Sequence, residues 1–190
     1  MGVSQRDAAR TRKALLDGAA RAIAAHGAGV SLDTVAREAG VSKGGLLHHF
    51  RSRDALLVGM VEEWLARFDA AVQQHLDPAD ERPGRLCRAH VRAGFDDAAG
   101  PDDDTWREPA LIGALLAVPD VLRRARDSDR QWRQDLATDG LHPQRVALIA
   151  GTLDGLTMRQ MFGDPPDPTE RATLQALLLT LTEETGPLVG

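Results

Sequence analysis

The side chains best suited to bind a polyanion lie in residues 34–50, which read TVAREAGVSKGGLLHHF. Gly40 can adopt the positive φ of a tight turn, and the apolar residues around it are spaced as the inner faces of two short helices. These apolar residues are Val35, Ala36, Ala39, Val41, Leu46 and Phe50. The second helix opens with SKGG at 42–45, where small residues let a helix N-terminus approach a duplex and Lys43 can bind a phosphate or a guanine. The segment therefore predicts a DNA-binding helix-turn-helix.

Other patterns that could support chemistry are weaker. His48 and His49 are adjacent on the expected helix, so they point about 100° apart, and no third ligand is spaced to join them. Cys87 has arginines beside it that could lower the pKa of its thiol and make it a redox sensor, but a lone helical cysteine is more typical of inert packing. The acidic run 102–104 is typical of a solvated loop. Since no Ser-His-Asp order, glycine-rich phosphate loop or HExxH motif is present, we expect no catalytic residue, no metal site and no cofactor.

The composition predicts that helices position these residues. The 190-residue chain contains 29 Ala and 25 Leu, against 12 Val and 3 Ile, and it has no Tyr. Ala and Leu favour helices, whereas β-branched and aromatic residues favour strands. Gly and Pro divide the chain into nine expected helices: 6–26, 34–39, 42–50, 52–76, 85–99, 105–117, 120–138, 143–162 and 168–185.

Charge is unevenly distributed along the chain. The net charge of −5 combines a basic segment, residues 1–53 with +5, and an acidic remainder with −10. A basic segment on an acidic body is expected if only that segment meets a polyanion, although chance segregation stays open. No apolar stretch approaches 18 residues, and residues 1–13 lack the apolar centre of a secretory signal. We therefore expect a cytoplasmic protein without membrane contact.

The segment Ser31–Leu57, SLDTVAREAGVSKGGLLHHFRSRDALL, resembles the DNA-binding signature of the TetR family of bacterial transcriptional repressors. The similarity covers about residues 10–60, where the turn, the recognition helix, the HF pair and the following cap fall in register. It implies an all-α fold, with a three-helix DNA-binding domain at residues 1–53 and a larger helical-bundle domain for ligand binding and dimerisation at residues 54–190. It also implies a homodimer on a near-palindromic operator, with half-sites about 34–36 Å apart, and a small molecule that lowers DNA affinity.

One position departs from the family pattern. Family members usually carry Tyr where this chain has Leu47, which cannot contact a phosphate through a hydroxyl but could touch a thymine methyl. We expect DNA contacts from residues at the starts of the two helices and just after them: Ser31, Thr34, Ser42, Lys43, Gly44, Gly45, Leu47, His48, His49 and Arg53. The missing Tyr motivates an alternative, a helical small-molecule binding or catalytic protein that has lost DNA binding.

The long helix expected at residues 52–76 contains no Pro and is predicted to act as a rigid lever between the two domains. Aromatic and basic residues on this helix and beyond it are predicted to line an effector site: Trp64, Phe68, Arg92, Phe95 and Trp106. The same aromatic residues could simply form a core. An apolar lining predicts a small, mostly hydrophobic effector.

The last two expected helices carry apolar stripes that predict a dimer interface of four helices. The stripes comprise Val146, Ile149, Leu153, Leu156, Leu174, Leu177, Leu178 and Leu181. Two helices from each copy would form the bundle. A second interpretation, in which these stripes close the core of a single chain, stays open.

Overall fold

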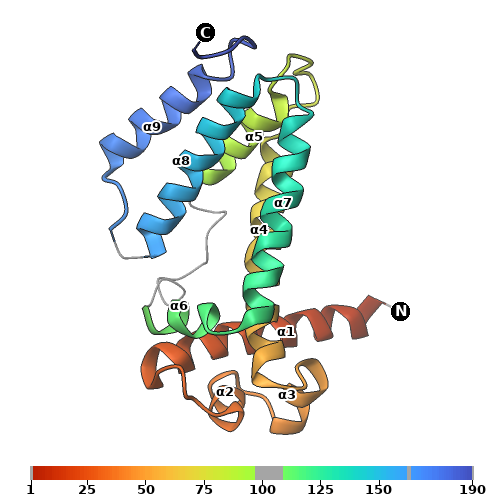
Figure 1. Cartoon of the computed structure of the whole chain (residues 1–190). Helices are drawn as coiled ribbons and strands as arrows, with labels where there is room; N and C mark the ends of the chain where they lie inside the picture. The colour runs from red at the N-terminus through yellow and green to blue at the C-terminus, as the bar shows by residue number, and fades with distance from the viewer. Residues whose placement is uncertain (1, 97–108, 162–163, 190) are drawn as a thin grey trace. The chain divides into compact units, whose positions relative to one another are not determined.

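The computed structural model describes residues 2–96, 109–161 and 164–189, with side chains for 7–96, 111–160 and 164–189. These residues form nine helices and no strand, which confirms the expected all-helical fold (Figure 1). The helices are α1 (Gly2–His26), α2 (Leu32–Glu38), α3 (Lys43–His49), α4 (Arg53–His75), α5 (Arg85–Gly94), α6 (Pro109–Leu116), α7 (Pro119–Ala137), α8 (Pro143–Met161) and α9 (Pro168–Thr180). Two compact units result, a first unit of residues 1–63 and 103–125 and a second unit of residues 64–102 and 126–190. Among the described helices, none has both the length and the apolar character needed to cross a membrane.

Capping side chains set several of the helix starts. Ser31 and Ser42 precede α2 and α3, and each hydroxyl accepts a hydrogen bond from the main-chain N–H three residues later, at 3.2 and 3.1 Å respectively. Asp167 caps α9, which opens with Pro168, where the missing N–H would have had no helical partner. A cap of this kind stabilises a helix by about 1 kcal/mol.

In the first unit, α1 packs against α2 and α6, and α2 packs against α3. Helix α1 lies close to the turn after α2 at Gly18, where a Cβ would lie 2.8 Å from both the N and the Cβ of Ala39. Gly40 has φ +69°, as expected for the turn, and the next residue, Val41, donates its N–H to the carbonyl of Ala36 at 2.9 Å. The core of this unit includes Leu15, Leu16, Ala19, Ile23, Val35, Leu46, Phe50, Leu57 and Met60. The helix-turn-helix is therefore held against α1 by a contact that leaves no room for a side chain at Gly18.

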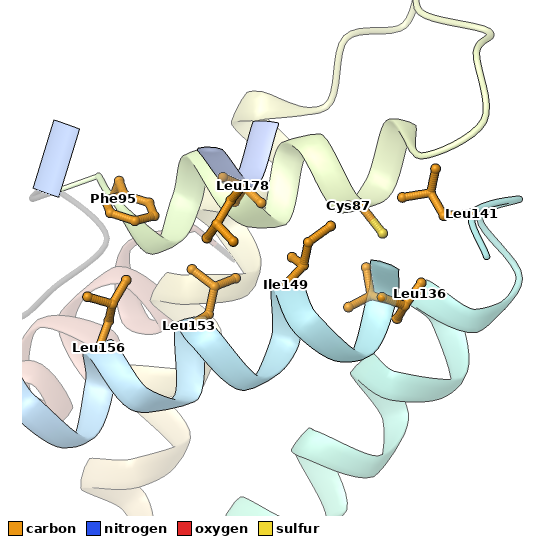
Figure 2. Close-up of a cluster of buried hydrophobic side chains, with 10 residues drawn as sticks. Cys87, Phe95, Leu136, Leu141, Ile149, Leu153, Leu156 and Leu178 are labelled. Carbon is orange, nitrogen blue, oxygen red and sulfur yellow. The ribbon is translucent and has the colours of Figure 1, made fainter. Parts of the chain in front are cut away.

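The core of the second unit joins α5, α8 and α9 (Figure 2). It comprises Cys87, Val91, Phe95, Leu136, Leu141, Val146, Ile149, Leu153, Leu156 and Leu178. Burying each large aliphatic side chain contributes about 1.5–3 kcal/mol relative to leaving it in water. We call this cluster the α5–α8–α9 core.

Helix α5 begins without a capping side chain of its own, because Gly84 occupies the N-cap with φ +82°. Asp139, which follows α7, supplies the cap. Its two carboxylate oxygens accept hydrogen bonds from the N–H groups of Leu86 at 3.0 Å and Cys87 at 2.7 Å. The end of α7 and the start of α5 are thereby joined through polar groups that are far apart in the sequence.

The buried side chain of Arg88 joins the loop before α5 to the segment after α9. Its guanidinium donates to the carbonyl oxygens of Arg82 at 3.1 Å, Pro83 at 2.9 Å and Thr182 at 3.2 Å. Its Nε also donates to Asp80 at 2.7 Å. Hydrogen bonds from Arg82 and Arg88 hold the pKa of Asp80 well below its usual value, so this carboxylate stays charged.

A second buried arginine, Arg145 on α8, holds the same C-terminal segment. It donates to the carbonyl oxygens of Leu181 at 2.9 Å and Gly186 at 2.6 Å, and it pairs with Glu184 at 2.9 Å. The sequence pattern predicts that α9 continues five residues beyond Thr180, and this prediction is wrong. Beyond Thr180, the N–H groups of Thr182 and Glu183 donate to carbonyls only three residues earlier, and the two arginines bind the carbonyls of Leu181, Thr182 and Gly186.

Candidate functional site

The first turn of α3 is an open surface. Helix α3 buries only the side chain of Leu46, and Leu47 is exposed. Around Gly44 there is open space, with no atom within 4 Å of the position that a Cβ would take. At Gly45 a Cβ would lie 3.3 Å from the hydroxyl of Ser42, so there is less room for a side chain here than at Gly44. A flat helix start of this kind can come close to a DNA duplex.

Lys43 stands at this helix start and pairs with Asp33 of α2, with 3.0 Å between Nζ and Oδ2. Both side chains are exposed. Exposed ion pairs of this type contribute only about 0–1 kcal/mol, so little free energy opposes the transfer of Lys43 to another anion. The lysine is therefore available to a phosphate or a guanine.

Several of the other predicted DNA contacts also have partners inside the protein. The hydroxyls of Ser31 and Ser42 act as acceptors in the caps of α2 and α3, and that of Thr34 lies 3.1 Å from the Ser31 hydroxyl. A hydroxyl that accepts through a lone pair can still donate its proton, so the capping role and a phosphate contact are compatible. Arg53 donates from Nη2 to the carbonyl of Ala28, which engages part of its guanidinium within the first unit.

The two adjacent histidines of α3 differ in exposure. His48 is exposed, whereas His49 is half-buried with its ring 6.4 Å from that of Phe50. The guanidinium of Arg12 also lies over Phe50, 4.9 Å from its ring centre, and pairs with Glu62 at 3.4 Å. His48 is thus the more accessible histidine. Arg12 joins α1 to α4 through its ion pair with Glu62.

The five predicted effector residues lie in different surroundings. Phe95 is buried in the α5–α8–α9 core, and Phe68 packs against a separate buried cluster of α4 and α5. Trp64 and Arg92 are half-buried, and Trp106 lies outside the described residues. The structure therefore does not bring Phe68 and Phe95 into one cluster.

Phe68 instead meets two rings that the sequence analysis did not select, His90 of α5 and Trp132 of α7. The ring centres are 4.9 Å apart for Phe68 and His90, 4.8 Å for His90 and Trp132, and 6.2 Å for Phe68 and Trp132. The indole N–H of Trp132 donates to Asp69 at 3.1 Å. We call these three rings the Phe68–His90–Trp132 cluster.

Periodicity could have found both missed residues. Trp132 lies four residues after the buried Ser128 and four before the buried Leu136, so all three share one face of α7. His90 lies three residues after the buried Cys87 on α5.

Cys87 belongs to the α5–α8–α9 core. Burial raises the pKa of its thiol well above the usual value, and the nearby charge of Asp139 raises it further. The thiol is therefore protonated at neutral pH and unreactive as a nucleophile. This environment favours the packing interpretation over a redox sensor.

Most of the residues predicted at the dimer interface pack inside the chain. Five of them lie in the α5–α8–α9 core: Val146, Ile149, Leu153, Leu156 and Leu178. Figure 2 labels the last four of these. Leu174 and Leu181 are half-buried against this core, and Leu177 is 57% exposed. The opposite face of α8 presents an exposed stripe, in which Leu148 and Met158 are each 49% exposed and two glycines lie between them.

Two family models match this chain. The model for bacterial regulatory proteins of the tetR family matches residues 15–60, and the model described as tetracyclin repressor-like, C-terminal domain, matches residues 84–183. The HTH-type transcriptional regulator BetI of Burkholderia thailandensis is 29% identical over 171 residues, covering 85% of this chain and 87% of the relative. BetI of Pseudomonas aeruginosa is 30% identical over 152 residues, covering 74% and 76%.

Solved structures resemble the chain over nearly its whole length. The multidrug binding protein EbrR, complexed with ethidium, has a TM-score of 0.62 and 26% identity and covers 92% of this chain and 99% of its own. A TetR family member from Streptomyces coelicolor has a TM-score of 0.64 at 24% identity, with 92% and 99% coverage. The resemblance seen in the helix-turn-helix is therefore confirmed along the chain. The chain belongs to the TetR family of transcriptional regulators, with a helix-turn-helix for DNA and a C-terminal ligand-binding domain.

Proposed function

We propose that this regulator is a homodimeric repressor, which acts in the cytoplasm on a near-palindromic operator and leaves it when a small, mostly hydrophobic effector binds. The observation that carries the DNA-binding part is the helix-turn-helix with its open α3 start at Gly44. The alternative of a helical binding protein or enzyme without DNA binding is not favoured, because the family matches are to regulators.

Within this proposal, the residues at the start of α3 divide into two roles. Lys43, Leu47 and His48 are accessible and can reach bases or phosphates. The hydroxyls of Ser31, Thr34 and Ser42 set the helix starts and donate to phosphates, which fixes the register without reading sequence. His49 contributes by packing α3 against Phe50, and Arg53 contributes by holding the loop before α2 at Ala28.

The proposed coupling runs through α4, a single helix whose residues up to Glu63 belong to the first unit and whose residues from Trp64 belong to the second. An effector that contacts α4 beside Trp64 and Phe68 tilts this helix and changes the separation of the two DNA-binding heads. The effector must bind the tilted state more tightly, since equal affinity for both states shifts nothing. The complex of EbrR with ethidium shows that a related fold holds an aromatic compound.

The direct test is operator binding with and without a ligand. The operator is selected from a random duplex pool with the purified protein, and a ligand is found by its effect on thermal stability. We expect a stabilising ligand to lower operator affinity about 5- to 150-fold, and the Trp64→Ala variant to lose most of this response. A ligand that binds beside Trp64 and leaves operator affinity unchanged contradicts the coupling, and failure to select any duplex contradicts the function.

We expect the dimer to form through the exposed faces of α8 and α9. Leu177→Arg places a charge on an exposed position, so it should leave the monomer folded and raise the dimer dissociation constant about 100-fold or more. Sedimentation at micromolar concentration measures the change. Leu116→Arg, at an exposed leucine of α6, is the matched control and should stay dimeric. A wild-type monomer, or a Leu177→Arg dimer of unchanged strength, contradicts this interface.

A further inference from the structure

His90 is a buried polar residue of the second unit. It exposes only 9% of its surface, and its ring contacts those of Phe68 and Trp132. Its Nδ1 is fully buried and has no hydrogen-bond partner in the described part of the chain. Buried polar atoms are nearly always paired in folded proteins, and each exception calls for a partner such as a bound molecule or a water. The geometry thus leaves one polar atom unpaired within an apolar cluster.

The groups around His90 are uncharged or already paired. Phe68 and Trp132 pack against a buried cluster of Ala71, Val72, Ala89 and Ala93. The nearby carboxylate of Asp129 accepts from Arg133 at 3.0 Å, and that of Asp69 accepts from Trp132. Burial lowers the pKa of His90 to about 4, so its imidazole is neutral at pH 7. The same low polarity opposes the burial of a charged ligand.

The tautomer determines which partner fits. In a neutral histidine one ring nitrogen carries the proton and the other is an acceptor, and with the proton on Nε2 the buried Nδ1 of His90 is the acceptor. A molecule that supplies an N–H or O–H at this point would satisfy the orphaned nitrogen, and a flat apolar body would pack favourably against the rings of Phe68 and Trp132. Neither the hydrogen-bond donor nor the apolar body of such a ligand needs to carry a charge.

We propose that His90 Nδ1 is the polar anchor of a ligand site at the Phe68–His90–Trp132 cluster, and that the site takes a neutral aromatic molecule carrying one hydrogen-bond donor. The inference rests on the proposed function, because it assigns the chemistry of the effector. It adds His90 and Trp132 to the residues that determine which ligand binds.

Two nearly identical probes test the anchor. Indole carries an N–H, and 1-methylindole has the same aromatic body without the donor. Calorimetric titration of the full-length protein at pH 7.5 should show that indole binds about three- to tenfold more tightly, the range expected for one neutral hydrogen bond. In 15N-histidine NMR spectra of the wild type, indole should shift the His90 Nδ1 signal and 1-methylindole should not shift it in the same direction.

Variants separate the hydrogen bond from the difference in probe size. In His90→Phe, which keeps a ring and removes the unpaired nitrogen, the two probes should bind within about twofold of each other. His26→Phe, at an exposed histidine ending α1, should retain the wild-type preference. The NMR measurement needs no variant, so it decides the matter even if His90→Phe fails to fold.

Three results overturn the proposal: equal binding of the two probes to the wild type, a preference that persists in His90→Phe, or binding of ethidium with neither indole probe. Absence of all binding also overturns it, since a water would then be the partner of Nδ1. Operator affinity is measured separately. If indole binds through His90 and operator affinity does not change, the anchor stands and the proposed effector response fails.

Discussion

The Arg88→Met variant is expected to lose about 3–5 kcal/mol of its free energy of unfolding. Arg88 is buried and donates to three main-chain carbonyls and to Asp80. Methionine fills a similar volume but supplies no donor, so the acceptors lose this partner, and two of them, the Thr182 carbonyl and the Asp80 carboxylate, are largely shielded from water. Each buried carbonyl left without a donor costs about 1–3 kcal/mol. The loss is measured by urea unfolding followed by far-ultraviolet circular dichroism.

Arg123→Met is the matched control for this experiment. Arg123 is exposed on α7 and pairs with Asp120 three residues before it, at 2.6 Å. Loss of an exposed pair should change the free energy of unfolding by less than about 1 kcal/mol. If Arg88→Met falls in the same range as this control, the buried arginine does not secure the segment after α9.

The Gly44→Glu variant is expected to be at least as stable as the wild type and to lose most of its DNA affinity. Nothing lies within 4 Å of the Cβ position at Gly44, so the side chain fits without a clash. Glu also favours helix over Gly by about 0.5 kcal/mol. On DNA, however, it adds a negative charge and bulk at the surface that must approach the phosphates. We expect operator affinity to fall about 100-fold or more.

Gly113→Glu provides the control, because Gly113 is an exposed helical glycine of α6 with equally open space around it. It should gain similar stability and keep its operator affinity. Fluorescence anisotropy with the selected operator measures both variants at one salt concentration. Equal operator affinities for the two variants exclude the start of α3 from the DNA interface.

Most of the fold could be predicted from the sequence because local signals and packing agree. Gly40 marked the turn, Ser42 marked the start of α3, and Pro143 and Pro168 are the first residues of α8 and α9. In each case, the residue that starts or breaks the helix acts within a few positions of itself. Such short-range effects are visible in a single sequence.

The two buried arginines could not be predicted in the same way. Arg88 and Arg145 each look like surface residues, and both bind the segment after α9, which is distant from them in sequence. Two of the three partners of Arg145 are carbonyl groups after α9, which carry no side-chain signal. The sequence pattern alone therefore extends α9 past Thr180.

The apolar stripe of α8 shows what helical periodicity leaves undetermined. Its spacing correctly indicates a buried face, but periodicity cannot tell a chain's own core from a contact with a second copy. Ile149 and Leu153 lie in the α5–α8–α9 core. The smaller stripe on the opposite face, with Leu148 and Met158, is exposed in the single chain and belongs to the proposed dimer interface. The periodicity of α8 alone does not separate these two faces by role.

The single buried side chain of α3 has an evolutionary consequence. Only Leu46 ties this helix to the core, and the remaining positions after the Ser42 cap face solvent fully or in part. Mutations at those positions change what the helix can touch without removing core contacts. Duplicated copies of the gene can therefore diverge toward new operator sequences without first losing stability. The same freedom makes the first unit a tolerant scaffold for laboratory selection of altered DNA targets.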